Sequence, residues 1–157
     1  MRLKITGISV FILIIMLAGT ALAVDIDTLD KVSVLMPQSK VHSLLGSPDE
    51  IISLGKGLTA ELYKVTNAEP MIGTGCIYQD NQQLVAQAFI YKGIANKEAA
   101  ARLVHDGYNV LEETEGVFRL AGKDDDTGQP LVARISTENG MTMIMTFEKH
   151  FYDSWAK

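Results

Sequence analysis

The stretch Leu84-Val85-Ala86-Gln87-Ala88-Phe89-Ile90-Tyr91 is dominated by apolar side chains, a pattern typical of a central, half-buried strand. The polar residues 79–82 precede it and predict a turn, and residues 73–78 before that turn predict a second strand. Residues 58–66, which are also rich in apolar side chains, predict a third. Short strands separated by polar turns indicate hairpins, so we expect a three-stranded antiparallel meander.

The last third of the chain has the same pattern of short strands and turns. The dipeptide Asn139-Gly140 lies between two alternating apolar runs, and it favours a tight hairpin because both residues readily adopt positive φ. Residues 123–129 are polar and predict a longer loop. Strands are expected over residues 110–113, 116–121, 131–136 and 141–148.

A short helix is predicted over residues 37–45, upstream of the meander. Pro37 suits its first position, where a missing N–H costs nothing. Three apolar residues with helical spacing then form an inward stripe, and a glycine followed by a proline ends the helix. The residues of this stripe and stop are Val41, Leu44, Leu45, Gly46 and Pro48.

A second helix is predicted from its N-cap Asn96 to about Gly107, with Ala100, Leu103 and Val104 on its inward face. The order of elements is then a helix, about three strands, a second helix and three or four strands. This order predicts an α+β fold in which two helical segments pack on an antiparallel sheet. It also allows two tandem helix-plus-three-strand units, although the two halves share no clear sequence repeat.

Residues 1–23 have the three parts of a secretory signal. Two basic residues are followed by an apolar run over residues 8–17 and by Ala21-Leu22-Ala23, the small residues that signal peptidase requires. Cleavage after Ala23 is expected, which leaves residues 24–157 as a single α+β domain in the periplasm or outside the cell. The alternative is an uncleaved anchor, because residues 5–23 are just long enough to cross a bilayer.

Composition and charge limit the classes of partner. The 157 residues are 47% hydrophobic and 21% charged, which favours a globular fold over disorder. The formal net charge is −5, and the domain that follows the signal is more acidic still, because the signal contains Arg2 and Lys4 but no acid. Binding to nucleic acid or to an anionic membrane surface requires clustered basic residues, so neither is expected. A basic or neutral partner, or a small ligand, fits this charge better.

One part of the chain resembles a known family. Residues 35–48, with the glycines at 55 and 57 and the strand around residue 63, are similar to the signature of the small outer-membrane lipoprotein A family. That signature is a turn, a short helix with an inward valine, the motif Leu-Gly-x-Pro, and a strand with an aromatic residue. The resemblance covers only the N-terminal part of the mature chain. Its matching positions are Val41, Leu44, Leu45, Gly46, Pro48 and Tyr63.

The resemblance implies a role in the bacterial cell envelope. The family includes a lipoprotein of the outer-membrane β-barrel assembly machine, and it shares its fold with the β-lactamase inhibitor proteins. A similar function here would be binding to another protein through the face of the sheet or an exposed loop. The family usually carries a lipidated cysteine, which this chain lacks near Ala23, so no stable membrane anchor is expected after signal cleavage.

No catalytic, cofactor-binding or metal-binding constellation is predicted. The three histidines are far apart in the sequence and have no ligands at a recognised spacing. The acidic run over residues 124–128 fails the calcium-loop pattern, because its glycine comes one position too early and Ile135 stands where a glutamate is needed. A solvated loop is expected there. Cys76 is expected to be a small buried residue. The chain is therefore predicted not to be an enzyme and to need no cofactor.

The aromatic residues at the C-terminus are the candidate partner surface. Phe151, Tyr152 and Trp155 are large side chains that can anchor a protein partner, although packing into the core is an alternative. The sequence thus predicts a non-catalytic adaptor that binds another envelope protein. A periplasmic carrier or sensor for a small ligand or a metal ion is the alternative. An enzyme is the third and least favoured alternative, because catalytic residues can assemble from distant parts of a sequence.

Overall fold

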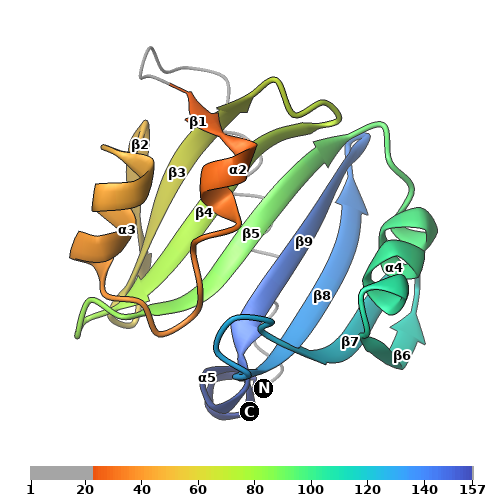
Figure 1. Cartoon of the computed structure of the whole chain (residues 1–157). Helices are drawn as coiled ribbons and strands as arrows, with labels where there is room; N and C mark the ends of the chain where they lie inside the picture. The colour runs from red at the N-terminus through yellow and green to blue at the C-terminus, as the bar shows by residue number, and fades with distance from the viewer. Residues whose placement is uncertain (1–22, 157) are drawn as a thin grey trace.

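A computed structural model of the chain describes residues 23–156 (Figure 1). Apart from Ala23, the predicted signal lies outside these residues. Val24 directly follows the predicted cleavage point, and it is buried and pairs with Val65. Within the described part of the chain, no helix is long and apolar enough to span a membrane.

The described residues form one nine-stranded sheet, which twists across the whole molecule (Figure 1). Its strand order is β1-β3-β4-β5-β9-β8-β7-β6, and β2 pairs with β3 beside β1. All pairs are antiparallel except the two-residue pair of β1 with β3. The strands are β1 (Val24–Asp25), β2 (Glu50–Gly55), β3 (Leu58–Thr66), β4 (Met71–Gln79), β5 (Leu84–Lys92), β6 (Asn109–Thr114), β7 (Val117–Lys123), β8 (Pro130–Glu138) and β9 (Met141–Glu148).

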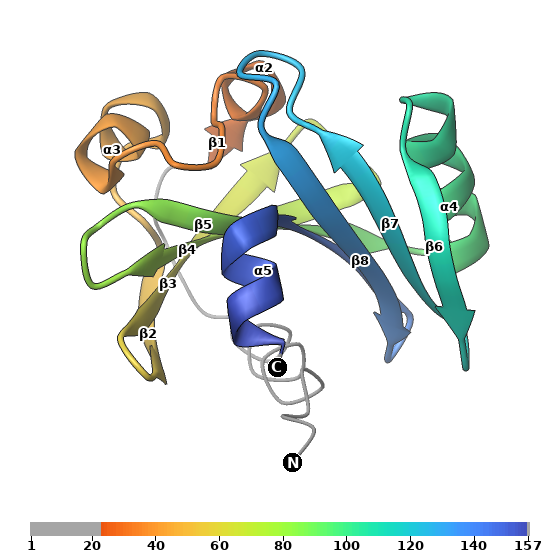
Figure 2. The same cartoon turned by 90° about the horizontal axis from the view of Figure 1, so that it is seen from below.

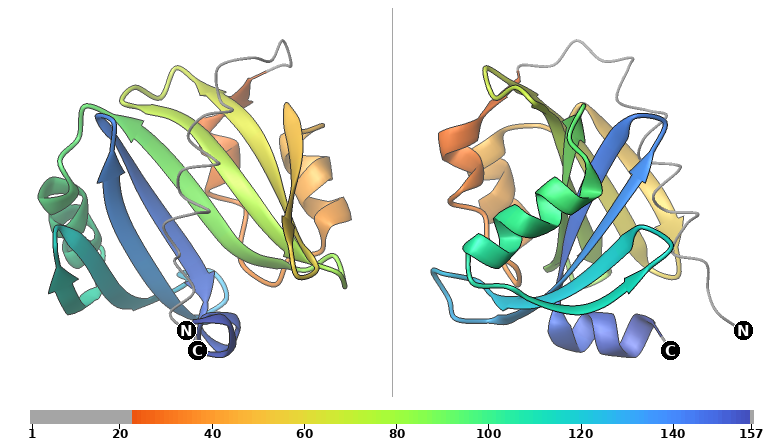
Figure 3. Two further views of the ribbon diagram at one scale, coloured as in Figure 1. Left: turned by 180° about the vertical axis from the view of Figure 1, so that it is seen from behind. Right: turned by 90° about the vertical axis from the view of Figure 1, so that its right-hand side faces the viewer.

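In the part of the chain that the structure describes, four short helices lie on the two faces of this sheet. Figure 2 shows α2, α3 and α4 on one side of the sheet, which we call the front face, and α5 on the opposite or back face. Viewed from behind, the strands lie in front of α2 and α3, and α4 lies at the edge of the sheet (Figure 3, left). The helices are α2 (Ile26–Leu29), α3 (Gln38–Leu45), α4 (Asn96–His105) and α5 (Lys149–Trp155).

The predicted fold class is wrong. We expected an α+β fold with two helical segments on an antiparallel sheet, whereas the structure is β-rich, with nine strands in a mixed sheet and four short helices in the described residues. The strands β1 and β2 at one end of the sheet and the helix α5 were not predicted. The parallel pairing of Val24 with Val65 makes the sheet mixed.

The sheet consists of two consecutive segments that share one order of elements. In each, a helix is followed by a four-stranded antiparallel meander: α3 precedes β2 to β5, and α4 precedes β6 to β9. The first meander has four strands rather than the predicted three, and the second has the four strands expected over residues 110–148. The segments join through the pairing of β5 with β9, in register from Ala86 with Phe147 to Lys92 with Met141.

Three clusters of buried apolar side chains hold the layers together. On the front face, one cluster lies under α2 and α3, and a second lies under α4. The third covers the back face and includes Phe151 and Tyr152 of α5. Phe89 and Tyr91 of β5 contact both front-face clusters, so the middle of the front face lies between two helical layers.

Candidate functional site

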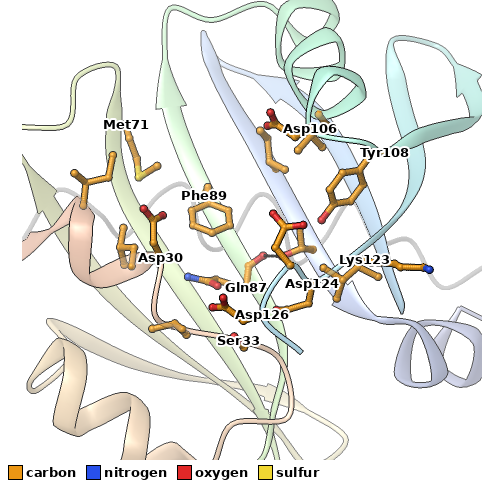
Figure 4. Close-up of a pocket in the computed structure, with 18 of the residues that line it drawn as sticks. Asp30, Ser33, Met71, Gln87, Phe89, Asp106, Tyr108, Lys123, Asp124 and Asp126 are labelled. Atoms are coloured by element: carbon orange, nitrogen blue, oxygen red, sulfur yellow. Dashed lines mark hydrogen bonds between the residues drawn. The ribbon is translucent and has the colours of Figure 1, made fainter. Parts of the chain in front are cut away.

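A cleft of about 600 Å³ opens on the front face, over the central strands β5 and β9 (Figure 4). We call it the central cleft. One wall is α2 with the segment that follows it, and the other is the C-terminal end of α4 with the loop between β7 and β8. The side chains used below are those of Asp30, Gln87, Phe89, Tyr91, Asp106, Tyr108, Lys123, Asp124, Asp125, Asp126 and Ile144.

The floor of the central cleft is largely apolar. Alternate residues of a strand point to the same face of the sheet, so Gln87, Phe89 and Tyr91 of β5 all face the front. Ile144 of β9 lies directly opposite Phe89 in the pairing register and extends this floor. The two aromatic rings are partly buried, because helices cover the clusters on either side of them but not the cleft itself.

Gln87 introduces an unsatisfied polar group at the base of the cleft. Gln87 is 5% exposed, and its side-chain Nε2 has no hydrogen-bond partner among the described residues. A buried donor without an acceptor costs about 1–3 kcal/mol. Figure 4 shows the Gln87 side chain among the residues that line the cleft. An acceptor atom of a bound molecule would satisfy this donor.

Carboxylates surround the cleft. Asp106 follows α4, Asp30 follows α2, and Asp124, Asp125 and Asp126 lie in the loop between β7 and β8. Asp124 also stabilises this loop, because its Oδ1 accepts hydrogen bonds from the backbone N and the hydroxyl of Thr127, both at 2.8 Å. Lys123 is the one basic side chain among the lining residues.

The two tyrosines of the cleft lie in this negative potential. Burial raises the pKa of Tyr108, the charges of Asp125, Asp124 and Asp106 act in the same direction, and together they bring this pKa to about 12. Burial also raises the pKa of Tyr91, an effect that Arg102 opposes and Asp30 reinforces. Both hydroxyls therefore remain protonated at neutral pH, and the carboxylates supply the charge of the cleft.

A glycine fixes the position of Tyr108. A Cβ atom built on Gly122 of β7 would lie 2.3 Å from Cε1 of the Tyr108 ring, so the ring lies directly against the glycine backbone. Only a residue without a side chain allows this approach. The arrangement holds the Tyr108 ring against β7, beside the acidic loop.

The acidic side chains are not arranged as a metal site. In residues 23–156, no group of three or more His, Cys, Asp or Glu side chains is placed to hold a metal ion. Carboxylates spread along a cleft with an aromatic floor suit an organic cation instead, such as an ammonium or guanidinium group, because an aromatic ring also attracts such groups.

A second polar cluster lies beneath α3, away from the cleft. Glu61 of β3 is completely buried, and its two carboxylate oxygens lie 2.9 and 2.8 Å from Nε2 of His42. Gln38 Nε2 and the Tyr63 hydroxyl donate further hydrogen bonds to it, at 2.6 and 2.9 Å. Cys76 lies opposite Glu61 in the register with β4. These contacts attach α3 to the sheet.

Cys76 is poorly suited to nucleophilic chemistry. The thiol is free and fully buried, and burial raises its pKa to about 12. A reactive cysteine needs an accessible thiolate near neutral pH. The expectation that Cys76 is a buried residue is confirmed.

The residues that carry the family resemblance belong to α3 and its surroundings. Three of them, Val41, Leu45 and Tyr63, are buried in one cluster, and Leu44 packs against it. The other two belong to the segment that leads from α3 to β2: Gly46 has φ 79° at the C-cap of the helix, and Pro48 follows two residues later.

The candidate partner surface at the C-terminus is part of α5. Phe151 and Tyr152 are buried, and Trp155 is partly buried against the same back-face cluster. The Phe151 and Trp155 rings stack with centroids 5.9 Å apart, and Phe147 of β9 lies 5.3 Å from Tyr152 and 6.2 Å from Trp155. In this structure the three rings pack on the sheet, and their role in partner binding stays a prediction.

Sequence reasoning missed the residues of the central cleft. The acidic run 124–126 was expected to be only a solvated loop, and Gln87 was assigned to a strand without a role. Two features of the sequence could have indicated the cleft: the consecutive acidic residues of that loop, and a glutamine within an apolar strand. Comparisons with protein-family models, curated proteins and solved structures give no match for this chain.

Proposed function

We propose that this chain is a non-catalytic binding protein of the bacterial cell envelope, and that its central cleft takes a cationic segment of a partner protein. The observation that carries the proposal is an open cleft with an aromatic floor, five surrounding carboxylates and an unpaired buried amide. Export to the envelope rests on the secretory pattern of residues 1–23.

The charge of the cleft selects a basic side chain. Asp30 on one wall faces the carboxylates of the other wall across Phe89, so a lysine or arginine that enters the cleft has acidic groups on both sides. Its aliphatic stem would pack on the aromatic floor while its charged end remains near the carboxylates. A ring beneath the cation contributes about 0.5–1 kcal/mol at a partly exposed site.

Gln87 favours a protein segment over a bare cation. Its unpaired Nε2 is a donor, which a cation cannot satisfy. A peptide carbonyl next to the basic residue would accept this hydrogen bond, so a peptide supplies both the charge and the acceptor that the cleft lacks.

A carrier for a small cationic ligand is the second candidate. The same unpaired amide favours it, because a small molecule with an ammonium group and a carbonyl oxygen also satisfies both requirements. Native mass spectrometry of the protein purified from its own cells distinguishes the two. A carrier would retain a bound small molecule, whereas the proposed adaptor would be recovered without one.

The test is capture of the partner by crosslinking in the cell envelope, followed by mass spectrometry. The variant D106N/D125N/D126N removes three charges of the cleft but keeps Asp124, which the loop needs for its own hydrogen bonds. The matched control E69Q/D80N/E113Q removes three exposed carboxylates that do not line the cleft.

We expect the same partner with the wild-type protein and with the control variant, and much less of it with the cleft variant. The crosslinked segment of the partner should contain lysine or arginine. Equal recovery with both variants, or a crosslinked segment without basic residues, would contradict the proposal.

A further inference from the structure

A second, smaller cavity of about 270 Å³ lies on the back face, between strands β6 to β8 and helix α5. Its two basic residues, Arg119 and Arg134, alternate along their strands with Phe118, Leu120, Ala133 and Ile135, which pack under α4 on the front face. Tyr152 of α5 forms its wall. We call this cavity the arginine pocket. Its lining residues are Glu112, Thr114, Glu115, Val117, Arg119, Arg134 and Tyr152.

The two arginines are direct cross-strand partners. Arg119 of β7 lies opposite Arg134 of β8 in the pairing register. Like charges in this position destabilise a sheet unless another group neutralises them. Glu112 partly does so, since its Oε2 lies 3.0 Å from Nη2 of Arg119. Arg134 has no hydrogen bond or ion pair of its side chain among the described residues.

Two guanidinium nitrogens in the pocket lack acceptors. Nε of Arg119 and Nη1 of Arg134 are both buried, and neither has a hydrogen-bond partner within residues 23–156. Burial also lowers the pKa of Arg134, which means that the surroundings penalise its charge. A half-buried cation without a counterion is costly, and a bound anion would remove that cost.

We propose that the arginine pocket binds a small monocarboxylate, whose oxygens accept hydrogen bonds from Arg119 Nε and Arg134 Nη1. The planar carboxylate matches the fork of donors that a guanidinium group presents. The hydroxyl of Tyr152 is a further donor in the lining. The Thr114 hydroxyl already donates to Glu112 Oε1 at 3.2 Å. Val117 provides an apolar surface for a short hydrocarbon tail.

The charges of the lining select a monoanion over a dianion. Glu112 and Glu115 balance the two arginines, so the pocket is neutral as a whole, and the carboxylates of its rim repel added negative charge. A carboxylate brings one negative charge to the guanidinium groups, whereas phosphate at neutral pH brings about 1.5. This inference does not depend on the proposed function, because the pocket and the central cleft lie on opposite faces.

The test is titration of the purified protein with sodium butyrate, with sodium phosphate and sodium chloride as comparison salts. NMR detection of the Arg119 Nε–H group reports directly on one of the two proposed donors. We expect a saturable shift of this resonance with butyrate, weaker binding of phosphate, and no saturation with chloride.

Two substitutions test the residues. Arg134→Met should weaken butyrate binding about tenfold or more, because a hydrogen bond to a charged group contributes about 1.5–3 kcal/mol. Glu115→Gln should strengthen it, since it removes a repelling charge. Arg102→Met is the control, because Arg102 lies on α4 and pairs with Glu98. If Arg134→Met does not fold, Arg134→Lys replaces it, which keeps the charge but loses the planar donor fork.

Several outcomes would overturn the proposal. They are the absence of saturation with butyrate, tighter binding of phosphate than of butyrate, or equal weakening by the Arg102 and Arg134 substitutions. The proposal would also fail if Glu115→Gln lost stability and gained no affinity for butyrate. That result would identify Glu115 as the counterion of Arg134 in solution.

Discussion

At Glu61 a carboxylate is held entirely out of water, and it is stabilised by side chains from two elements. Gln38 and His42 approach it from α3, and Tyr63 approaches it along β3. A buried carboxylate needs all of its partners, because transfer of an unpaired charge from water into the interior is strongly unfavourable. The cluster therefore fixes where α3 sits on the sheet, and its energetics can be tested one residue at a time.

His42→Ala should lower the free energy of unfolding by about 2–3 kcal/mol. The substitution leaves the buried carboxylate with fewer partners, which costs about 3–5 kcal/mol at a fully buried pair. The effect is reduced here because the His42 side chain is 39% exposed and water can replace part of it. Urea unfolding measures the change. His105→Ala, at an exposed position of α4, is the control and should change stability by less than about 0.5 kcal/mol. If His42→Ala lowered the free energy of unfolding no more than His105→Ala does, the contact between His42 and Glu61 would contribute little to stability.

Cys76 should not react with a thiol reagent such as DTNB in the native protein at pH 8. Its pKa of about 12 leaves almost no thiolate at that pH, and its complete burial excludes the reagent. In concentrated urea the same thiol should react within the time of mixing. Rapid labelling under native conditions would mean that β4 opens readily or that the thiol is accessible.

At the scale of elements, α5 contributes more than its seven residues suggest. Its start is capped by Glu148, whose carboxylate accepts hydrogen bonds from the backbone N atoms of His150 and Phe151. The rings of Phe151 and Trp155 then stack over the Phe147 end of β9. The helix therefore covers one end of the back face through aromatic packing.

Phe151→Ala should destabilise the protein by about 3 kcal/mol, because it removes a buried ring and leaves a cavity between α5 and the sheet. Thermal or urea unfolding measures this loss. Lys149→Ala on the same helix removes only an exposed pair with Asp153, and its cost should be below about 0.5 kcal/mol. If Phe151→Ala left stability unchanged, the ring would be available for a partner, as the sequence analysis suggested.

The elements differ in how well the sequence predicts them. The bounds of β3 and β9 coincide with the predicted ranges, because apolar side chains and the Asn139-Gly140 turn are strong local signals. The strand β2 was missed because the run of residues 51–54 is short and ends at Gly55, which begins a turn that also includes Gly57, both with positive φ. The helix α5 follows β9 without a glycine or proline between them, so no local signal separates it from the strand.

The central cleft required information that a single sequence does not contain. The apolar alternation in residues 84–91 does indicate that Gln87 and Phe89 share a face. Nothing local indicates that β5 pairs with β9, the last strand of the chain. This long-range pairing brings the segment after α2 and the loop at residues 123–126 to the same opening. The floor was therefore predictable in part, and the walls were not.

At the scale of the whole molecule, the pairing of β5 with β9 makes one continuous sheet from two segments of similar architecture. Unfolding of either segment would leave the other with an unpaired central strand and an exposed apolar back face. Losing the strand pairing and exposing the apolar face are both strongly unfavourable. Neither segment should therefore remain folded alone, and the protein should unfold in one cooperative transition.

The single tryptophan and the single cysteine allow this prediction to be tested without added labels. Trp155 reports on α5 and the second segment, since it stacks on Phe147, whereas Cys76 lies in β4 of the first segment. The urea midpoint of Trp155 fluorescence should coincide with that of Cys76 exposure to a brief pulse of thiol reagent, and far-UV circular dichroism should give the same midpoint. If Cys76 became reactive at clearly lower urea than the tryptophan transition, the first segment would unfold on its own, and the β5–β9 pairing would be too weak to couple the two halves.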